Sequence, residues 1–117
     1  MMLTRYLACF GLLTLGTMRA ASTAEINDYP TEARAEYVFA CMKTNGDTQI
    51  ALRQCACSID VIASILPYER YVQASTVLSM RQGVGLRAAG FRGTKVYDDM
   101  VAELRRAQAE AEVRCFR

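Results

Sequence analysis

Hydrophobic residues recur at intervals of three and four along most of the chain after residue 30, a pattern typical of helices that bury one face. The clearest stripe, at spacings of three, four, three and four, consists of Leu52, Cys55, Ile59, Ile62 and Leu66. It predicts a helix over about residues 48–66. Because a proline disfavours helical dihedrals in the residue before it, we expect this helix to end where Pro67 follows.

The same periodicity predicts a helix on the N-terminal side and two on the C-terminal side, over about residues 31–44, 67–82 and 95–115. Gly46 suits the left-handed end of the first helix, and Asp47 suits the cap of the next one. Residues 83–94 contain four glycines and no sustained period, so we expect a loop there. Since no stretch alternates like a half-buried strand, the fold class is all-α, with about four short helices in a small bundle.

The first 24 residues have the organisation of a secretory signal peptide. Arg5 precedes an apolar run over residues 6–15, and Ser22 and Ala24 suit a signal-peptidase site. We therefore expect residues 1–24 to be a signal peptide and residues 25–117 to form a single helical domain that is periplasmic or secreted.

The charge balance of the expected mature chain argues against nucleic acid as a partner. Loss of Arg5 and Arg19 with the leader reduces the 14 basic residues to 12, which equals the number of acidic residues. A nucleic-acid-binding protein would carry a basic excess. No later stretch approaches the roughly 20 apolar residues that span a bilayer, so stable membrane insertion is not expected either.

The leader also contains Cys9, so the expected mature chain has Cys41, Cys55, Cys57 and Cys115. An even number of cysteines in a small exported chain favours disulfides. On a helix, two residues that are two apart point to nearly opposite sides, so Cys55 and Cys57 should bond to different partners. We expect Cys41 to pair with Cys55, with Cys41 to Cys57 as the close alternative, and Cys115 to take the remaining cysteine.

Two sharper hypotheses concern Cys41, Cys55 and Cys57. Thiolates are good ligands of soft metals such as Cu(I), and the Cys-x-Cys pair could instead exchange disulfides with other proteins. An oxidising compartment favours structural disulfides over both roles, and we therefore predict no bound metal and no cofactor. The chain also has no histidine, which excludes histidine-based catalytic triads and the usual zinc sites. These observations favour a non-catalytic role over an enzyme.

The glycine-rich loop is the best candidate for a partner-binding surface. Arg81, Arg87, Arg92 and Lys95 place four positive charges there, and no acidic residue lies between Arg81 and Lys95. Phe91 lies among them, and an aromatic side chain near arginines is a common interface anchor. Such a loop could bind an anionic partner or membrane headgroups, and the alternative is a solvated mobile loop without a partner. We predict that these five residues bind another periplasmic protein.

The stretch over residues 37–82, with its Cys…Cys-x-Cys arrangement, resembles small exported bacterial proteins and looks like accessory proteins of periplasmic quinoprotein alcohol oxidation. The resemblance implies a protein partner and no activity. The sequence as a whole therefore indicates a non-catalytic periplasmic binding or accessory protein with two disulfides. The alternatives are the thiol or copper-handling protein described above and an ATP-independent periplasmic chaperone, which would expose apolar surface on acidification.

Overall fold

The computed structural model describes residues 27–117, so the expected leader lies outside the described part of the chain. The elements are α1 Thr31–Asn45, α2 Gln49–Ile65, α3 Tyr68–Arg81, α4 Leu86–Gly90 and α5 Lys95–Cys115. The all-α prediction is confirmed, and the four predicted helices agree with α1, α2, α3 and α5 to within a residue or two. The short α4 lies inside the predicted loop.

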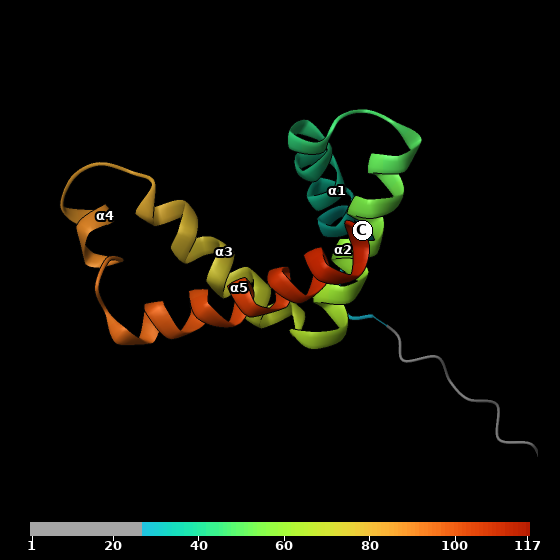
Figure 1. The fold of residues 1–117 in the computed structure, drawn as a ribbon. Coiled ribbons are helices and arrows are strands. Elements are labelled where there is room, and N and C mark those ends of the chain that lie inside the picture. Colours follow the sequence, from blue (N-terminus) through green and yellow to red (C-terminus); the bar gives the residue numbers. More distant parts are fainter. Residues whose placement is uncertain (1–26) are drawn as a thin grey trace, which may run out of the picture.

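The helices form two hairpins that meet at a corner (Figure 1). α1 and α2 make the first hairpin, and α3 and α5 run side by side as a longer arm with α4 at its far end. The C-terminal part of α5 continues past the corner and packs against α2. The axes of α2 and α3 are bent by 112°. Among the described helices none alone is long and apolar enough to cross a membrane, although the bent pair α2 and α3 would be so together.

Turn residues set the ends of the first hairpin. Gly46 ends α1 at a φ of 98°, and its backbone N–H donates to the Met42 carbonyl, in agreement with the predicted left-handed end. The predicted cap at Asp47 is wrong, because Thr48 caps α2 by accepting a hydrogen bond of 3.1 Å from the Ala51 N–H. A threonine hydroxyl performs the same capping as a carboxylate when it lies one residue nearer the helix.

The residues just before α1 are part of the core, although the sequence shows no helical period there. Tyr29 is buried, and its hydroxyl donates a hydrogen bond of 2.7 Å to the carbonyl oxygen of Leu66, the residue at which α2 ends. Its ring packs against Tyr68 and Tyr71 of α3, with centroids 5.1 and 5.2 Å away. Asp28 accepts a hydrogen bond from the Tyr68 N–H at the start of α3. This segment therefore fixes the corner between the two hairpins.

Burial in the corner changes the acidity of these phenols. Loss of solvent raises the pKa of Tyr29 well above its usual value, and the neighbouring Tyr71 adds to the shift. Burial also raises the pKa of Tyr71. Both side chains therefore stay neutral well into the alkaline range.

The core lies where α2 crosses α5 and the corner. Its fully buried large side chains are Cys55, Ile59, Ile62 and Leu104. The predicted stripe of α2 is confirmed at Cys55, Ile59, Ile62 and Leu66, but it is wrong at Leu52, which is 38% exposed while the adjacent Ala51 is buried. Leu52 lies in the first turn of α2, next to the loop that joins α1 and α2 and at the other end of α2 from the corner.

Candidate functional site

Two disulfides attach the neighbouring helices to α2. Cys41 of α1 bonds to Cys55, and Cys115 of α5 bonds to Cys57; the Cα atoms are 5.8 Å apart in each pair. This is the pairing expected first from the sequence. Because Cys55 and Cys57 point to different sides of α2, each crosslink joins it to a different helix. All four cysteines of the described chain are thus in structural positions.

Both the thiol-exchange and the metal-binding hypotheses require a reactive cysteine. Residues 27–117 contain no free thiol, since each cysteine there is disulfide-bonded. Cys55 has no exposed surface, so an attacking thiolate would have to approach its bond from the half-buried Cys41 side. Within this part of the chain, no group of three or more His, Cys, Asp or Glu side chains is arranged to hold a metal ion. Cu(I) binding by these cysteines would therefore require prior reduction, and thiol exchange would require an external thiolate to attack one of the two disulfides.

The predicted partner-binding residues all lie at the far end of the α3–α5 arm. We call this region, residues 81–95 with the first turn of α5, the tip. Arg81 connects its two sides: its Nε donates to the Phe91 carbonyl at 2.5 Å, and its guanidinium pairs with Asp98 at 2.6 Å. Arg81 therefore organises the tip and its charge is neutralised, although the sequence between Arg81 and Lys95 contains no acidic residue.

Three further predicted residues also have intramolecular roles in the tip. Arg92 donates to the carbonyl oxygens of Arg81 and Gly83 at 2.7 and 2.9 Å, which closes the loop. Phe91 stacks on Tyr97 with ring centroids 5.0 Å apart and is only partly exposed. Lys95 pairs with Asp99, and this hydrogen bond raises the pKa of Lys95.

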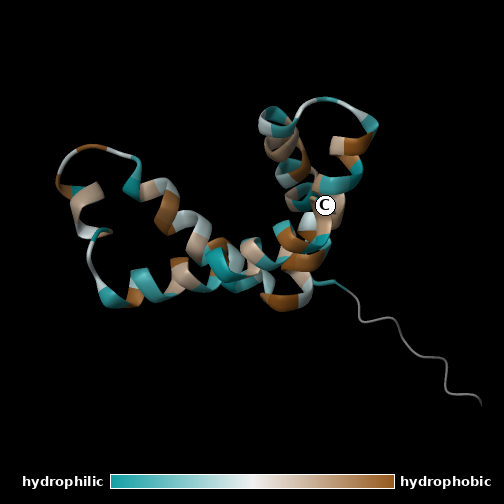
Figure 2. Cartoon of the chain, in the orientation of Figure 1, coloured by the Kyte–Doolittle hydropathy of each residue, from teal (hydrophilic) through white to brown (hydrophobic). Residues whose placement is uncertain are grey.

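Arg87 and two neighbouring aliphatic residues are the outward-facing part of the tip. Arg87 is exposed, and within residues 27–117 neither it nor Arg92 pairs with a carboxylate. Val84 and Leu86 are 98% and 94% exposed. Figure 2 shows hydrophobic residues on this loop leading into α4. Neither side chain was predicted from the sequence to bind a partner, although their position beside glycines in Gly83-Val84-Gly85-Leu86 offered a signal.

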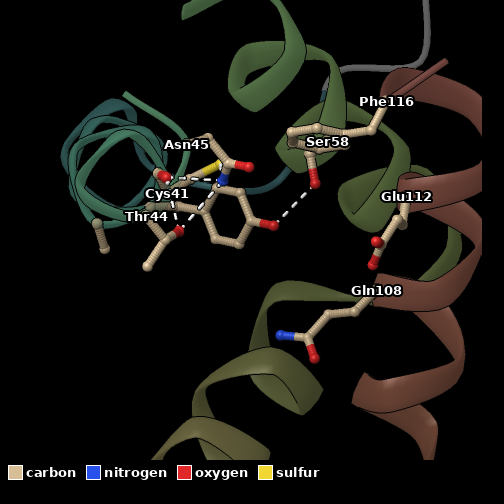
Figure 3. A pocket seen from close by; sticks show the side chains of 9 residues that line it. Cys41, Thr44, Asn45, Ser58, Gln108, Glu112 and Phe116 are labelled. Atoms are coloured by element: carbon tan, nitrogen blue, oxygen red, sulfur yellow. Dashed lines mark hydrogen bonds between the residues drawn. The ribbon is translucent and has the colours of Figure 1, made fainter. Parts of the chain in front are cut away.

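A second candidate site is a concave region between the two hairpins. Its part nearest α5 has a volume of about 400 Å³ and is lined by Tyr37, Ala40, Cys41, Thr44, Asn45, Ser58, Gln108, Glu112 and Phe116. Figure 3 shows Cys41, Thr44 and Asn45 on one side and Gln108, Glu112 and Phe116 on the other, with Ser58 between them. The Tyr37 and Ser58 hydroxyls are hydrogen-bonded at 2.8 Å. The sequence offered no signal for this pocket, because it depends on the angle between the hairpins.

Comparisons with known proteins add no relative to this picture: no protein-family model, curated protein or solved structure matches the chain significantly.

Proposed function

We propose that this protein is an exported, non-catalytic binding protein that docks on a partner protein through its tip. Support for an oxidising compartment comes from the two disulfides together with the signal-peptide pattern of residues 1–24, since the cytosol keeps most thiols reduced. The bacterial periplasm is such a compartment. The resemblance of residues 37–82 to accessory proteins of quinoprotein alcohol oxidation makes enzymes of that class the first partners to test.

The observation that carries the proposal is the exposure of Val84 and Leu86. Neither side chain contributes to the core, and covering one aliphatic side chain of this size contributes about 1.5–3 kcal/mol. Two such anchors can therefore supply much of the free energy of a transient complex once the cost of association is met. Side chains that project from a loop fixed by Arg81 and Arg92 are already positioned for insertion into a pocket.

The charges of the tip indicate the chemistry of the partner. Arg87 and Arg92 are not neutralised by carboxylates of the described chain, whereas Arg81 and Lys95 are paired with Asp98 and Asp99. The complementary surface is therefore an apolar pocket with acidic groups at its rim. Charges of this kind set the rate and specificity of association more than the final affinity, so docking should weaken with added salt.

The experiment is site-specific photocrosslinking in the native host, with a photoreactive residue in place of Leu86. A discrete crosslinked partner is expected. Combining Val84→Ser and Leu86→Ser should reduce affinity for that partner by about tenfold or more. Ile50→Ser is the matched control, because Ile50 is a similarly exposed aliphatic residue at 68% on the other hairpin. Equal affinities for the tip and control variants would contradict the proposal.

The chaperone alternative stays a prediction. Binding of a hydrophobic dye should then increase on acidification, whereas a docking protein with a fixed tip should bind the dye equally at neutral and acidic pH.

A further inference from the structure

The two hairpins enclose an open notch whose walls are α1 and α3. Its α3 side has a volume of about 500 Å³ and is lined by Ala33, Glu36, Tyr37, Ala40, Tyr68, Tyr71, Val72, Ser75, Thr76, Ser79 and Met80. Tyr37 and Ala40 also line the pocket beside α5, so the two hollows are adjacent. We call the combined region the notch. It lies between α1 and α3, whose hairpins diverge in Figure 1 because α3 is bent away from α2 at the corner.

The α1 wall is a helical face that other helices cover only in part. Residues of α1 line the notch at positions 33, 36, 37, 40, 41 and 44, the spacing of the buried face of a packed helix. Yet none of the α1 residues, all of which the structure describes, is buried. α1 packs mainly on α2, to which Tyr37 and Cys41 of this face are bonded. Glu36 and Ala40, further round the same face, are exposed.

Bonds to α2 fix the position of the α1 wall. The Cys41–Cys55 disulfide, the Tyr37–Ser58 hydrogen bond and the ion pair of Arg34 with Asp60 at 2.6 Å all connect α1 to α2. The opposite wall on α3 presents Val72 and Met80, which are 41% and 36% exposed. A ligand would therefore enter a site whose walls are already in place, which lowers the entropic cost of binding.

The charges in the notch have one sign. Glu36 and Glu112 are its charged lining residues, and its lining includes no lysine or arginine. Lys43, in the last turn of α1, does not line the notch; its Nζ lies over the Phe39 ring, 4.5 Å from the ring centre. Arg34 of the same helix is paired with Asp60. The notch thus combines apolar and hydroxyl-bearing walls with acidic groups.

We infer that the notch binds a cationic amphipathic helix of another protein. The apolar face of such a helix would cover Val72, Met80 and the exposed face of α1, and its lysines or arginines would lie near Glu36 and Glu112. The α1 residues that line the notch span about three turns, or about 18 Å, which sets the length of the occupant. This site is separate from the tip, so one molecule could hold two partner segments at once.

The test measures binding of a fluorescent model peptide by anisotropy. The peptide has about four helical turns of leucine and lysine arranged with a leucine face, and a second peptide has glutamate in place of lysine. The lysine peptide should bind at least about tenfold more tightly than the glutamate peptide. Ala40→Arg should weaken binding by about tenfold or more, because it adds bulk and positive charge inside the notch. Ala35→Arg is the control, since Ala35 is an exposed α1 residue that does not line the notch.

A second set of variants tests whether the acidic residues of the notch attract the cationic peptide. Glu36→Gln combined with Glu112→Gln should weaken lysine-peptide binding by about three- to tenfold at low salt and reduce its salt dependence. Glu32→Gln, an exposed residue of α1 outside the notch, should leave binding unchanged. Circular dichroism on every variant establishes that the helices are intact.

Three outcomes would overturn the inference. Equal binding of the two peptides would remove the electrostatic argument, and equal effects of Ala40→Arg and Ala35→Arg would place the peptide elsewhere. If the free protein is a dimer and Ala40→Arg makes it a monomer by analytical ultracentrifugation, the occupant is a second copy of this chain. The Leu86→Ser variant should bind the peptide normally, which separates this test from that of the proposed tip.

Discussion

Removal of the two disulfides should have different consequences for different helices. The first double variant, Cys57→Ala with Cys115→Ala, releases α5 from α2. The second, Cys41→Ala with Cys55→Ala, releases α1 from α2. Each pair is removed as a whole, so no free thiol remains to form a new bond.

The sequence separations of the bonded cysteines set the expected losses. Loop-closure entropy gives about 4 kcal/mol for the bond that spans 58 residues and about 3 kcal/mol for the one that spans 14. In a domain of this size, a loss of about 4 kcal/mol lowers the melting temperature by about 15–30 °C. The Cys57–Cys115 variant should therefore be the less stable of the two.

The two helices should respond differently to the loss of their disulfides, because α5 is packed in the core and α1 is not. α5 keeps Leu104, Ala107 and Ala111 in the core without its disulfide, whereas α1 has no buried residue to hold it. Hydrogen exchange should therefore show that amides of α1 lose protection selectively when Cys41–Cys55 is removed, while those of α2 and α5 keep theirs.

Urea unfolding and amide hydrogen exchange by mass spectrometry measure both effects. If α1 kept its protection without Cys41–Cys55, the helix would be held by packing, and the account of the α1 wall would be refuted. A shift below about 5 °C on removing Cys57–Cys115 would refute the loop-entropy argument for α5.

Two further perturbations test the hairpin turn and the corner. Thr48→Ala should cost about 1 kcal/mol in urea unfolding, because the first turn of α2 loses the acceptor for the Ala51 N–H; no measurable change would argue against this cap. Tyr29→Phe should cost about 1–2 kcal/mol, because the Leu66 carbonyl loses its buried donor. Since burial raises the pKa of Tyr29, the unfolded chain releases the phenolic proton above about pH 10 while the folded chain keeps it, so stability falls there. Unfolding curves between about pH 9 and 11 should show a smaller decline for Tyr29→Phe than for the natural protein, and equal declines would contradict the assignment.

The helices and the disulfide pairing followed from local pattern. Cys55 shares a stripe with Ile59 and Ile62, so it had to face inward, and Cys57 had to face another helix. The three-residue connection around Gly46 favoured Cys41 to Cys55 but left Cys41 to Cys57 as a close alternative, and the structure has the first pairing. These inferences needed only the helical period and a short turn.

The core residues that sequence reasoning missed depend on contacts between distant segments. Tyr29 lies in a polar stretch without periodicity, and it is buried only because Leu66, Tyr68 and Tyr71 converge around it. Leu52 fits the stripe of α2 but is 38% exposed, whereas the adjacent Ala51 is buried. Local period therefore predicted which way a side chain points but not whether another helix covers it.

The candidate sites were predictable only in part for the same reason. The arginines of the tip were visible in the sequence, whereas Asp98, which neutralises Arg81, comes from 17 residues further along the chain. The short α4 has too few residues to show a period, so Val84 and Leu86 were not recognised as projecting side chains. The notch depends on the bend between α2 and α3, which the corner around Tyr29 sets.

The most direct test of the account is a peptide map of the protein exported by its native host, alkylated without reduction to trap free thiols. We expect peptides joined through Cys41–Cys55 and Cys57–Cys115, with no alkylated cysteine in the mature chain. That result would establish α2 as the element to which α1 and α5 are both crosslinked. An alkylated Cys55 or Cys57, or a Cys41–Cys57 bond, would contradict the account and make thiol chemistry at α2 the leading hypothesis.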